Sequence, residues 1–130
     1  MLKAVKRDEA EAFNLPGRDW FLYIGPESSE AKNMTVGFAT FPEGSAPPGH
    51  VHPIQEEIIY ITSGHGELVT PEGTAKLDPG TVVYIEANTQ YGFEVWDEGV
   101  RFLNIRQGLA RYAEAGEQSM DPYETGAAKG

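Results

Sequence analysis

Two histidines and a glutamate lie close together in the chain, and their side chains are of the types that bind metal ions. His50 and His52 are one residue apart, and Glu57 follows five positions later. Residues i and i+2 of a β-strand project from the same face, roughly 6.5 to 7 Å apart, so both imidazoles can bind one ion. Pro53 breaks the strand and resets its parity, which lets the carboxylate join them. We therefore predict a metal site at His50, His52 and Glu57.

The types of these side chains restrict the ion. Two imidazoles and one carboxylate are the ligands of mononuclear non-haem Fe(II) centres, and the same set suits Mn, Ni, Co and Zn. The chain has no cysteine, so thiolate ligands, disulfides and thiol nucleophiles are excluded. Burying such groups without a shared cation or a complete hydrogen-bond network is costly. The expected cofactor is a divalent transition metal.

Length and charge restrict the other partners. A chain of 130 residues forms one compact domain. Its formal net charge of −10 disfavours nucleic acid and anionic membrane surfaces. No apolar run reaches the length of a membrane helix, and the N-terminal segment is charged where a signal peptide would be apolar. We expect a cytoplasmic protein with a small-molecule substrate, and neither a nucleic-acid nor a membrane partner.

The spacing of apolar residues and turns predicts an all-β fold. The chain has 15 Gly and 9 Pro, and turn signals such as Pro71-Glu72-Gly73 separate short runs rich in β-branched and aromatic residues. Eight such runs suggest a small barrel or jelly roll. The expected strands are 20–24, 34–41, 57–62, 66–70, 74–77, 82–85, 92–96 and 100–105.

The segments outside these strands are expected to be extensions of one barrel. Residues 1–19 are charged, with a few helix-favouring Ala and Glu residues, and are predicted to form an N-terminal arm. Residues 20–108 form the predicted barrel. Residues 109–130 are predicted to form a short helix followed by a partly flexible tail, because the hydrophobic periodicity ends there.

The residues around the two histidines resemble the first signature motif of the cupin superfamily. Gly44, His50, His52, Glu57 and Gly64 all stand at the spacings of that family. The resemblance implies a cupin double-stranded β-helix, a jelly-roll-like barrel with its site in the interior, often built as a homodimer. Family spacing also selects Glu57 rather than its neighbour as the ligand, so that Glu56 is expected to face solvent.

The second cupin motif is only partly present. Gly73 and the Pro79-Gly80 turn before Val82–Ile85 resemble its opening, but Tyr91 stands where the family has a fourth ligand, a histidine. Three outcomes remain open: ligation by the phenol, a three-ligand site with additional water, or a site without metal. We favour the second, in which Tyr91 is a candidate general acid, although an ordinary half-buried strand tyrosine is the alternative.

Strand alternation outlines a pocket around this site. If Glu57 and Tyr91 face inward, other members of their strands do so as well, which gives a mostly apolar cavity. His65, between two glycines, is expected to be structural. The predicted inward set is Ile59, Ile61, Phe93 and Val95, with Met34, Phe38, Phe41, Phe102 and Asn104 as further candidates.

Three kinds of function fit these residues. The first is a metal-dependent enzyme of oxygenase, lyase or isomerase type acting on a small oxygenated organic substrate. The second is a metal-free acid and base catalyst of the cupin epimerase kind, which uses a histidine and Tyr91. The third is a binding or sensing module without turnover. The cupin resemblance does not select among the reactions, because the superfamily hosts many.

Overall fold

The protein is built almost entirely of β-strands in a computed structural model. The structure describes residues 1–26, 29–45, 49–52 and 55–107, with only the backbone at positions 50, 97, 98, 104, 106 and 107. The segment 109–130, predicted as a helix and tail, lies outside the described residues. One 3-10 turn, η1 (Arg7–Glu9), is the helical element of the described part. No helix among those residues is long and apolar enough to cross a membrane.

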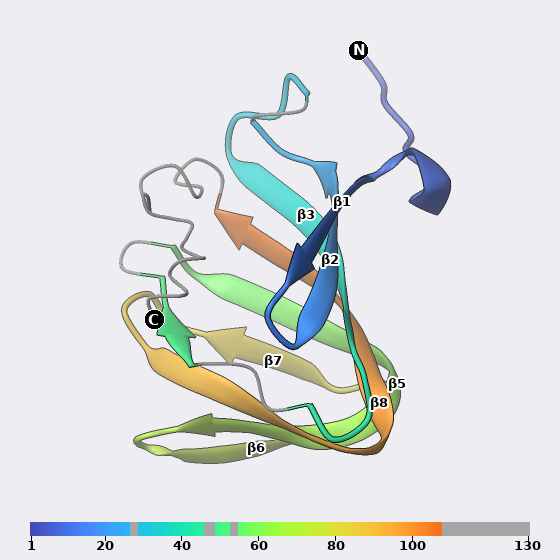
Figure 1. The fold of residues 1–130 in the computed structure, drawn as a ribbon. Coiled ribbons are helices and arrows are strands. Elements are labelled where there is room, and N and C mark those ends of the chain that lie inside the picture. The colour runs from blue at the N-terminus through green and yellow to red at the C-terminus, as the bar shows by residue number, and fades with distance from the viewer. Residues whose placement is uncertain (27–28, 46–48, 53–54, 108–130) are drawn as a thin grey trace.

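Eight antiparallel strands form one continuous hydrogen-bonded sheet (Figure 1). Its main path runs in the order β1-β2-β3-β8-β5-β6, while β4 pairs with β8 and β7 pairs with β5. The all-β prediction is therefore confirmed. The strands are β1 (Glu11–Leu15), β2 (Arg18–Ile24), β3 (Met34–Phe41), β4 (His50–Val51), β5 (Glu57–Thr70), β6 (Gly73–Leu77), β7 (Val82–Ile85) and β8 (Gln90–Gln107).

The two long strands fold this sheet into two layers. β5 and β8 pair along most of their lengths and bend together at one side of the molecule (Figure 1). On one side of the bend, half of each strand belongs to the first layer, and on the other side the remaining half of each strand continues into a second layer. The first layer contains β1, β2, β3 and β7 with one half of each long strand, and the second contains β4 and β6 with the other halves. The space between the layers is the interior of the barrel.

The bend lies between the expected strands 57–62 and 66–70 and between 92–96 and 100–105, where Ser63-Gly64 and Asp97-Glu98-Gly99 have the composition of turns, and neither segment ends a strand. Both lie inside continuous strands, and the ladder shifts register there, from Gly64 opposite Val100 to Gly66 opposite Val95. Gly64 and Gly99 have positive φ values of 86° and 74°. A Cβ atom on Gly64 would overlap the carbonyl oxygen of Gly99. The glycines permit two backbones to cross closely. In the sequence, glycines at such a crossing look the same as glycines in a turn.

The strand β1 is absent from the sequence prediction, which places its residues in an arm. It forms a hairpin with β2, with Phe13 opposite Trp20. Phe13 and Leu15 alternate with exposed residues and pack partly against the core, and the Phe13 and Trp20 rings lie 5.6 Å apart. This alternation is too short to stand out from the charged residues around it. The sheet therefore begins at Glu11.

The core lies between the two layers. Its fully buried side chains are Ile59, Ile61, Leu77 and Val100. Three phenylalanines fill the space beside them: Phe93 and Phe102 stack with ring centroids 5.3 Å apart, and Phe41 lies 4.6 Å from Phe93. These rings and the four aliphatic side chains belong to one buried cluster, which also includes Tyr91.

Candidate functional site

Glu57 is the buried acidic residue at the start of β5. Its exposed fraction is 6%, whereas Glu56 beside it is exposed. The strand continues with inward residues at every second position, including Ile59 and Ile61. Because side chains alternate between the faces of a strand, the burial of these residues places Glu57 inside the barrel. The predicted choice of Glu57 over Glu56 as the inward residue is thus confirmed.

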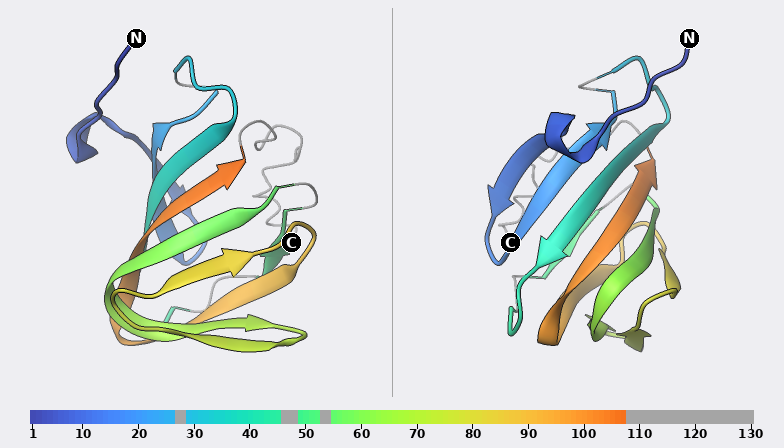
Figure 2. Two further views of the ribbon diagram at one scale, coloured as in Figure 1. Left: turned by 180° about the vertical axis from the view of Figure 1, so that it is seen from behind. Right: turned by 90° about the vertical axis from the view of Figure 1, so that its right-hand side faces the viewer.

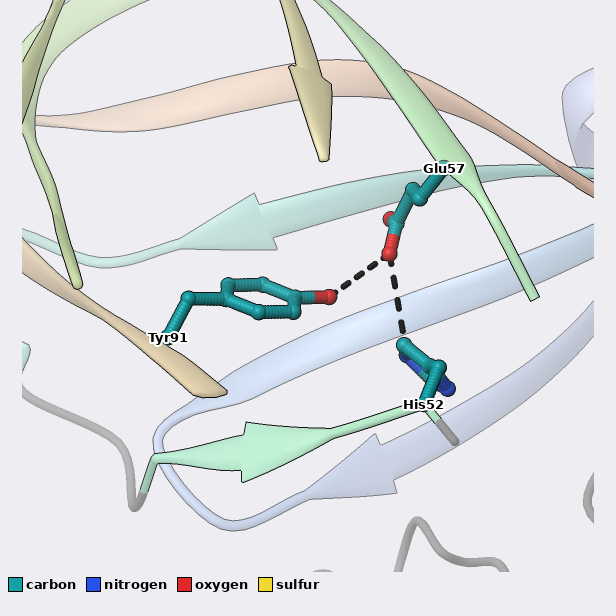
Figure 3. Close-up of polar contacts among 3 residues, drawn as sticks. All are labelled: His52, Glu57 and Tyr91. Atoms are coloured by element: carbon teal, nitrogen blue, oxygen red, sulfur yellow. Dashed lines mark hydrogen bonds and ion pairs between the residues drawn. The ribbon is translucent and has the colours of Figure 1, made fainter. Parts of the chain in front are cut away.

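Tyr91 and His52 both point at the Glu57 carboxylate (Figure 3). The Tyr91 hydroxyl donates a hydrogen bond of 2.6 Å to Glu57 Oε1, and His52 Nε2 lies 3.6 Å from the same oxygen. The side chains of His52 and Glu57 are 12% and 7% exposed, and Tyr91 is 3% exposed. Residues from both layers therefore converge on one oxygen atom in a nearly dry environment.

Backbone pairing at the edge of the second layer positions this end of the site. His50 lies opposite Tyr91 and Val51 opposite Gln90, so β4 is held against the beginning of β8. The Asn88 N–H donates a 2.8 Å hydrogen bond to the His52 carbonyl. Two residues of strand and one further hydrogen bond thus fix the backbone that carries both histidines. A strand this short carries no periodicity, so β4 is missing from the strands expected from alternation, although the spacing of the two histidines assumes a strand here.

The distances between donor atoms allow a test of whether an ion fits. Metal–ligand bonds of about 2.0–2.2 Å in a tetrahedral site separate two ligand atoms by about 3.3–3.6 Å. The 3.6 Å between His52 Nε2 and Glu57 Oε1 lies at the upper end of this range. The 2.6 Å from Tyr91 to Glu57 is shorter and is a hydrogen-bond length. The separation of His52 and Glu57 therefore suits a tetrahedral ion, and Tyr91 is the hydrogen-bond donor that orients the carboxylate.

The third predicted ligand is described only by its backbone. The side chain of His50 lies outside the described part of the structure. Among the described side chains, no three His, Cys, Asp or Glu residues come together as a metal-binding group. Metal binding by His50, His52 and Glu57 stays a prediction.

Most of the predicted pocket residues face the interior. Ile59, Ile61, Phe41, Phe93, Phe102 and Val95 are all buried. Two predicted members are wrong: Met34 is 55% exposed, and Phe38 contacts the Arg7 guanidinium from the outer face. On β3 the inward positions are Thr35, Gly37, Ala39 and Phe41, and Met34 and Phe38 have the opposite parity. The side chain of Asn104 lies outside the described part.

Two further polar residues, Gln55 and His65, lie on or near β5, one close to the site in sequence and one away from it. Gln55 is buried at 5% exposure, two positions before Glu57, although its sequence position alone did not mark it as part of the site. The sequence does contain a signal for its burial: if the alternation of β5 continues before Glu57, residues 55 and 57 lie on the same face. His65 lies in β5, away from the cluster, and its Nδ1 is 2.9 Å from Asp78 Oδ1. It is consistent with the expected structural role.

An open groove lies next to this cluster. It has a volume of about 340 Å³ and runs along β6, β7 and the end of β5. Its apolar lining includes the core residues Leu68 and Ile85, and Val83 packs against the same core. Ile85 is the register partner of Glu57 on the adjacent strand. The groove is therefore linked to the site through Ile85 and is not lined by His52, Glu57 or Tyr91 themselves.

A family comparison identifies the class of protein that this fold and site define. A family model described as "Cupin domain" matches residues 37–106, more than half of the chain. The protein therefore belongs to the cupin family, as the two motifs predict. An uncharacterized protein of Streptomyces coelicolor, SCO3923, is 28% identical over 104 residues, which cover 80% of this chain and 94% of that protein.

Several solved structures share the fold. The polyketide cyclase RemF from Streptomyces resistomycificus superposes with a TM-score of 0.70 at 24% identity, covering 82% of this chain and 80% of RemF. KdgF from Halomonas sp. gives 0.72 at 14% identity, covering 85% and 97%. Ectoine synthase from P. lautus gives 0.76 at 12% identity, covering 89% and 85%. At these identities the likeness establishes the cupin barrel and no specific activity.

Proposed function

We propose that this protein is a metal-dependent cupin enzyme that acts on a small oxygenated organic substrate. In this proposal His50, His52 and Glu57 hold one divalent transition metal, and Tyr91 supports Glu57 and exchanges a proton with the substrate. The observation that carries the proposal is the convergence of His52 and Tyr91 on one oxygen of a buried carboxylate. Such a group is costly to bury unless a cation or a complete hydrogen-bond network stabilises it.

The proposed ligands have complementary roles. When bound, the ion would supply Lewis acidity and, if it is redox-active, the ability to activate oxygen. Glu57 would bring negative charge, held in one orientation by the Tyr91 hydroxyl. The backbone of His50 pairs in register with Tyr91, which brings that part of β4 next to the site and supports the inclusion of His50 in the proposal.

The residues around the site favour proton-transfer chemistry in a dry cavity. A buried phenol that already shares a proton with a carboxylate can pass that proton to a substrate placed beside it. We therefore favour a lyase or isomerase reaction, including cyclisation, over an oxygenase reaction. The named activities of structural neighbours, a polyketide cyclase and an ectoine synthase, are compatible with this preference. The groove beside Ile85 would admit a small substrate.

Metal analysis of the purified chain tests the proposal. We expect about one equivalent of a divalent transition metal after purification without chelators, or after soaking the protein in the metal and removing the excess. Elemental analysis measures the ratio, and spectroscopy of the bound ion distinguishes iron from zinc or nickel. Less than about a tenth of an equivalent under both conditions would rule out the metal-dependent function.

Tyr91→Phe is predicted to weaken metal binding. Removing the hydroxyl deletes the hydrogen bond that orients Glu57, and loss of such an outer partner lowers metal affinity about 10- to 100-fold. Competition titration against a chelating dye measures the change. Tyr60→Phe is the matched control, because Tyr60 is 44% exposed on the outer side of β5 and should leave affinity unchanged. Equal affinities for the Tyr91 variant and the wild type would argue against this role.

The short Tyr91–Glu57 hydrogen bond also supports a second candidate, a metal-free acid and base catalyst. In that case His52 or Glu57 takes a proton from the substrate and Tyr91 returns one. Chelators would leave turnover unchanged, while Tyr91→Phe would abolish exchange of the substrate's C–H hydrogen with deuterated solvent. Loss of exchange on chelation would instead support the metal-dependent enzyme.

A further inference from the structure

The groove along β6, β7 and the end of β5 lies on the side of the barrel opposite the bend. The turn between β5 and β6 and the end of β7 both point to that side (Figure 1). The left-hand view of Figure 2 shows the same two segments from behind, again away from the bend. The groove volume of about 340 Å³ falls at the lower end of the range of small-molecule pockets. It is therefore large enough for a small organic ligand.

The buried part of the groove lining is apolar. Leu68 and Ile85 are 3% and 5% exposed, and Val83 packs against the same core. Ile85 lies opposite Glu57 in the pairing of β7 with β5, and Leu68 lies opposite Phe93 in the pairing of β5 with β8. An apolar part of a ligand that covers these side chains would be removed from water, which favours binding.

The exposed part of the lining carries negative charge. Glu72, in the turn between β5 and β6, and Glu86, directly after β7, are both exposed residues that line the groove. None of the described residues that line it is Lys, Arg or His. Among the side chains that the structure describes, neither carboxylate forms an ion pair. This lining therefore favours a cation over an anion.

Hydrogen bonds fix the backbone that carries one of these carboxylates. The Glu72 N–H donates a 3.1 Å hydrogen bond to Thr70 Oγ1, and the Thr70 hydroxyl donates a 2.8 Å hydrogen bond to the Gly73 carbonyl. On the other side of the groove, the pKa of the Tyr84 phenol is raised by desolvation and, to a smaller extent, by neighbouring carboxylates that include Glu86. The negative charge of Glu86 thus acts on a second residue of the lining.

We propose that this groove binds a small organic molecule with a primary ammonium at one end and an apolar body. An ammonium has only N–H donors and no acceptor. It is therefore matched by the oxygen atoms of the lining residues Glu72, Glu86, Thr74 and Thr89. The apolar body would lie on the buried part of the lining. The groove carries this site by itself, and only the identification of the ligand as the substrate of the enzyme rests on the proposed function.

NMR titration of the full-length chain, treated with a chelator to remove metal, tests the proposal. Three probes are compared: hexylammonium, which has both parts of the ligand, hexanol, which lacks the charge, and methylammonium, which lacks the apolar body. Hexylammonium is expected to shift the backbone amide signals of segments 70–75 and 83–89, which carry most of the lining. It should bind about three- to tenfold more tightly than either of the other probes. Equal affinity for hexanol, or shifts confined to other parts of the chain, would overturn the proposal.

Two double variants separate the groove from the general negative charge of the chain. Glu72→Gln with Glu86→Gln is expected to weaken hexylammonium binding about three- to tenfold. Glu67→Gln with Glu94→Gln is the matched control, because it removes the same charge from residues that are paired on β5 and β8 outside the lining, and it should keep the wild-type affinity. Equal losses in both would show that the net charge of −10 attracts the probe and would overturn the proposal. Because the protein is titrated without metal, failure of these tests leaves the metal-dependent function standing, and failure of the metal analysis leaves the groove unaffected.

Discussion

Glu57→Gln is expected to abolish the stabilisation of this protein by divalent transition metals. The variant keeps the size of the side chain and its ability to accept the Tyr91 hydrogen bond, but it removes the negative charge that a cation needs. A ligand that binds only the folded state at about 100 times its dissociation constant adds about 2.7 kcal/mol. For a domain of this size, that corresponds to a rise in Tm on the order of 10 °C.

The neighbouring residue provides a matched control for this experiment. Glu56→Gln makes the same chemical change one position away, on an exposed side chain of the same strand region. Melting curves with and without metal should show the full rise in Tm for wild type and Glu56→Gln, and none for Glu57→Gln. Without metal, Glu57→Gln should be at least as stable as wild type, because it removes a buried charge. A metal-dependent rise in Glu57→Gln would show that Glu57 is not a ligand.

The parts of the fold that the sequence predicts are those fixed by alternation over several residues. β3 and β7 have the predicted bounds, and Glu57 and Tyr91 face inward as expected, since one face of each strand must be buried. β1 and β4 are missing from the strands expected from alternation because they are too short or too charged to show a period. Glycine signals at the bend were interpreted as turns, because a glycine permits a close backbone crossing as readily as a turn.

The errors on β3 have a different cause. Met34 and Phe38 were expected in the cavity because apolar residues usually mark the buried face of a strand. On this strand both faces are apolar: Ala39 and Phe41 face the core, while Val36 and Phe38 lie on the opposite side of the strand. Alternation cannot distinguish the two faces when a second apolar surface exists.

For the site, the sequence predicts which residues meet and leaves open how they meet. The cupin spacing brings Glu57 together with His52, and Tyr91 occupies the position of the missing histidine. The direct hydrogen bond between Tyr91 and Glu57 joins residues 34 positions apart. It depends on the reach of a phenol across the barrel, which spacing within one strand does not determine. Three-dimensional pairing of β4 with β8 supplies that information.

Gly64→Ala is expected to destabilise the fold strongly, and by more than Gly80→Ala, the same substitution at another glycine with positive φ. The added Cβ atom would overlap the Gly99 carbonyl oxygen and lie 2.9 Å from the Val100 Cα atom, both of them backbone atoms at the crossing of β5 and β8. The residue also has a φ of +86°, where an alanine is strained by about 1–2 kcal/mol. Overpacking adds about 1–3 kcal/mol, so we expect the free energy of unfolding to fall by about 2–5 kcal/mol in total.

Gly80→Ala separates the clash from the backbone strain. Gly80 has nearly the same φ, +89°, but its Cβ position has no atom within 4 Å. This variant should therefore lose only the strain of about 1–2 kcal/mol. Urea unfolding followed by circular dichroism measures both losses, since the midpoint shifts in proportion to the change in stability when the slope is constant. If the two variants unfolded at the same urea concentration, the tight crossing of β5 and β8 would contribute nothing to stability, and the bend that brings Tyr91 over Glu57 would need another cause.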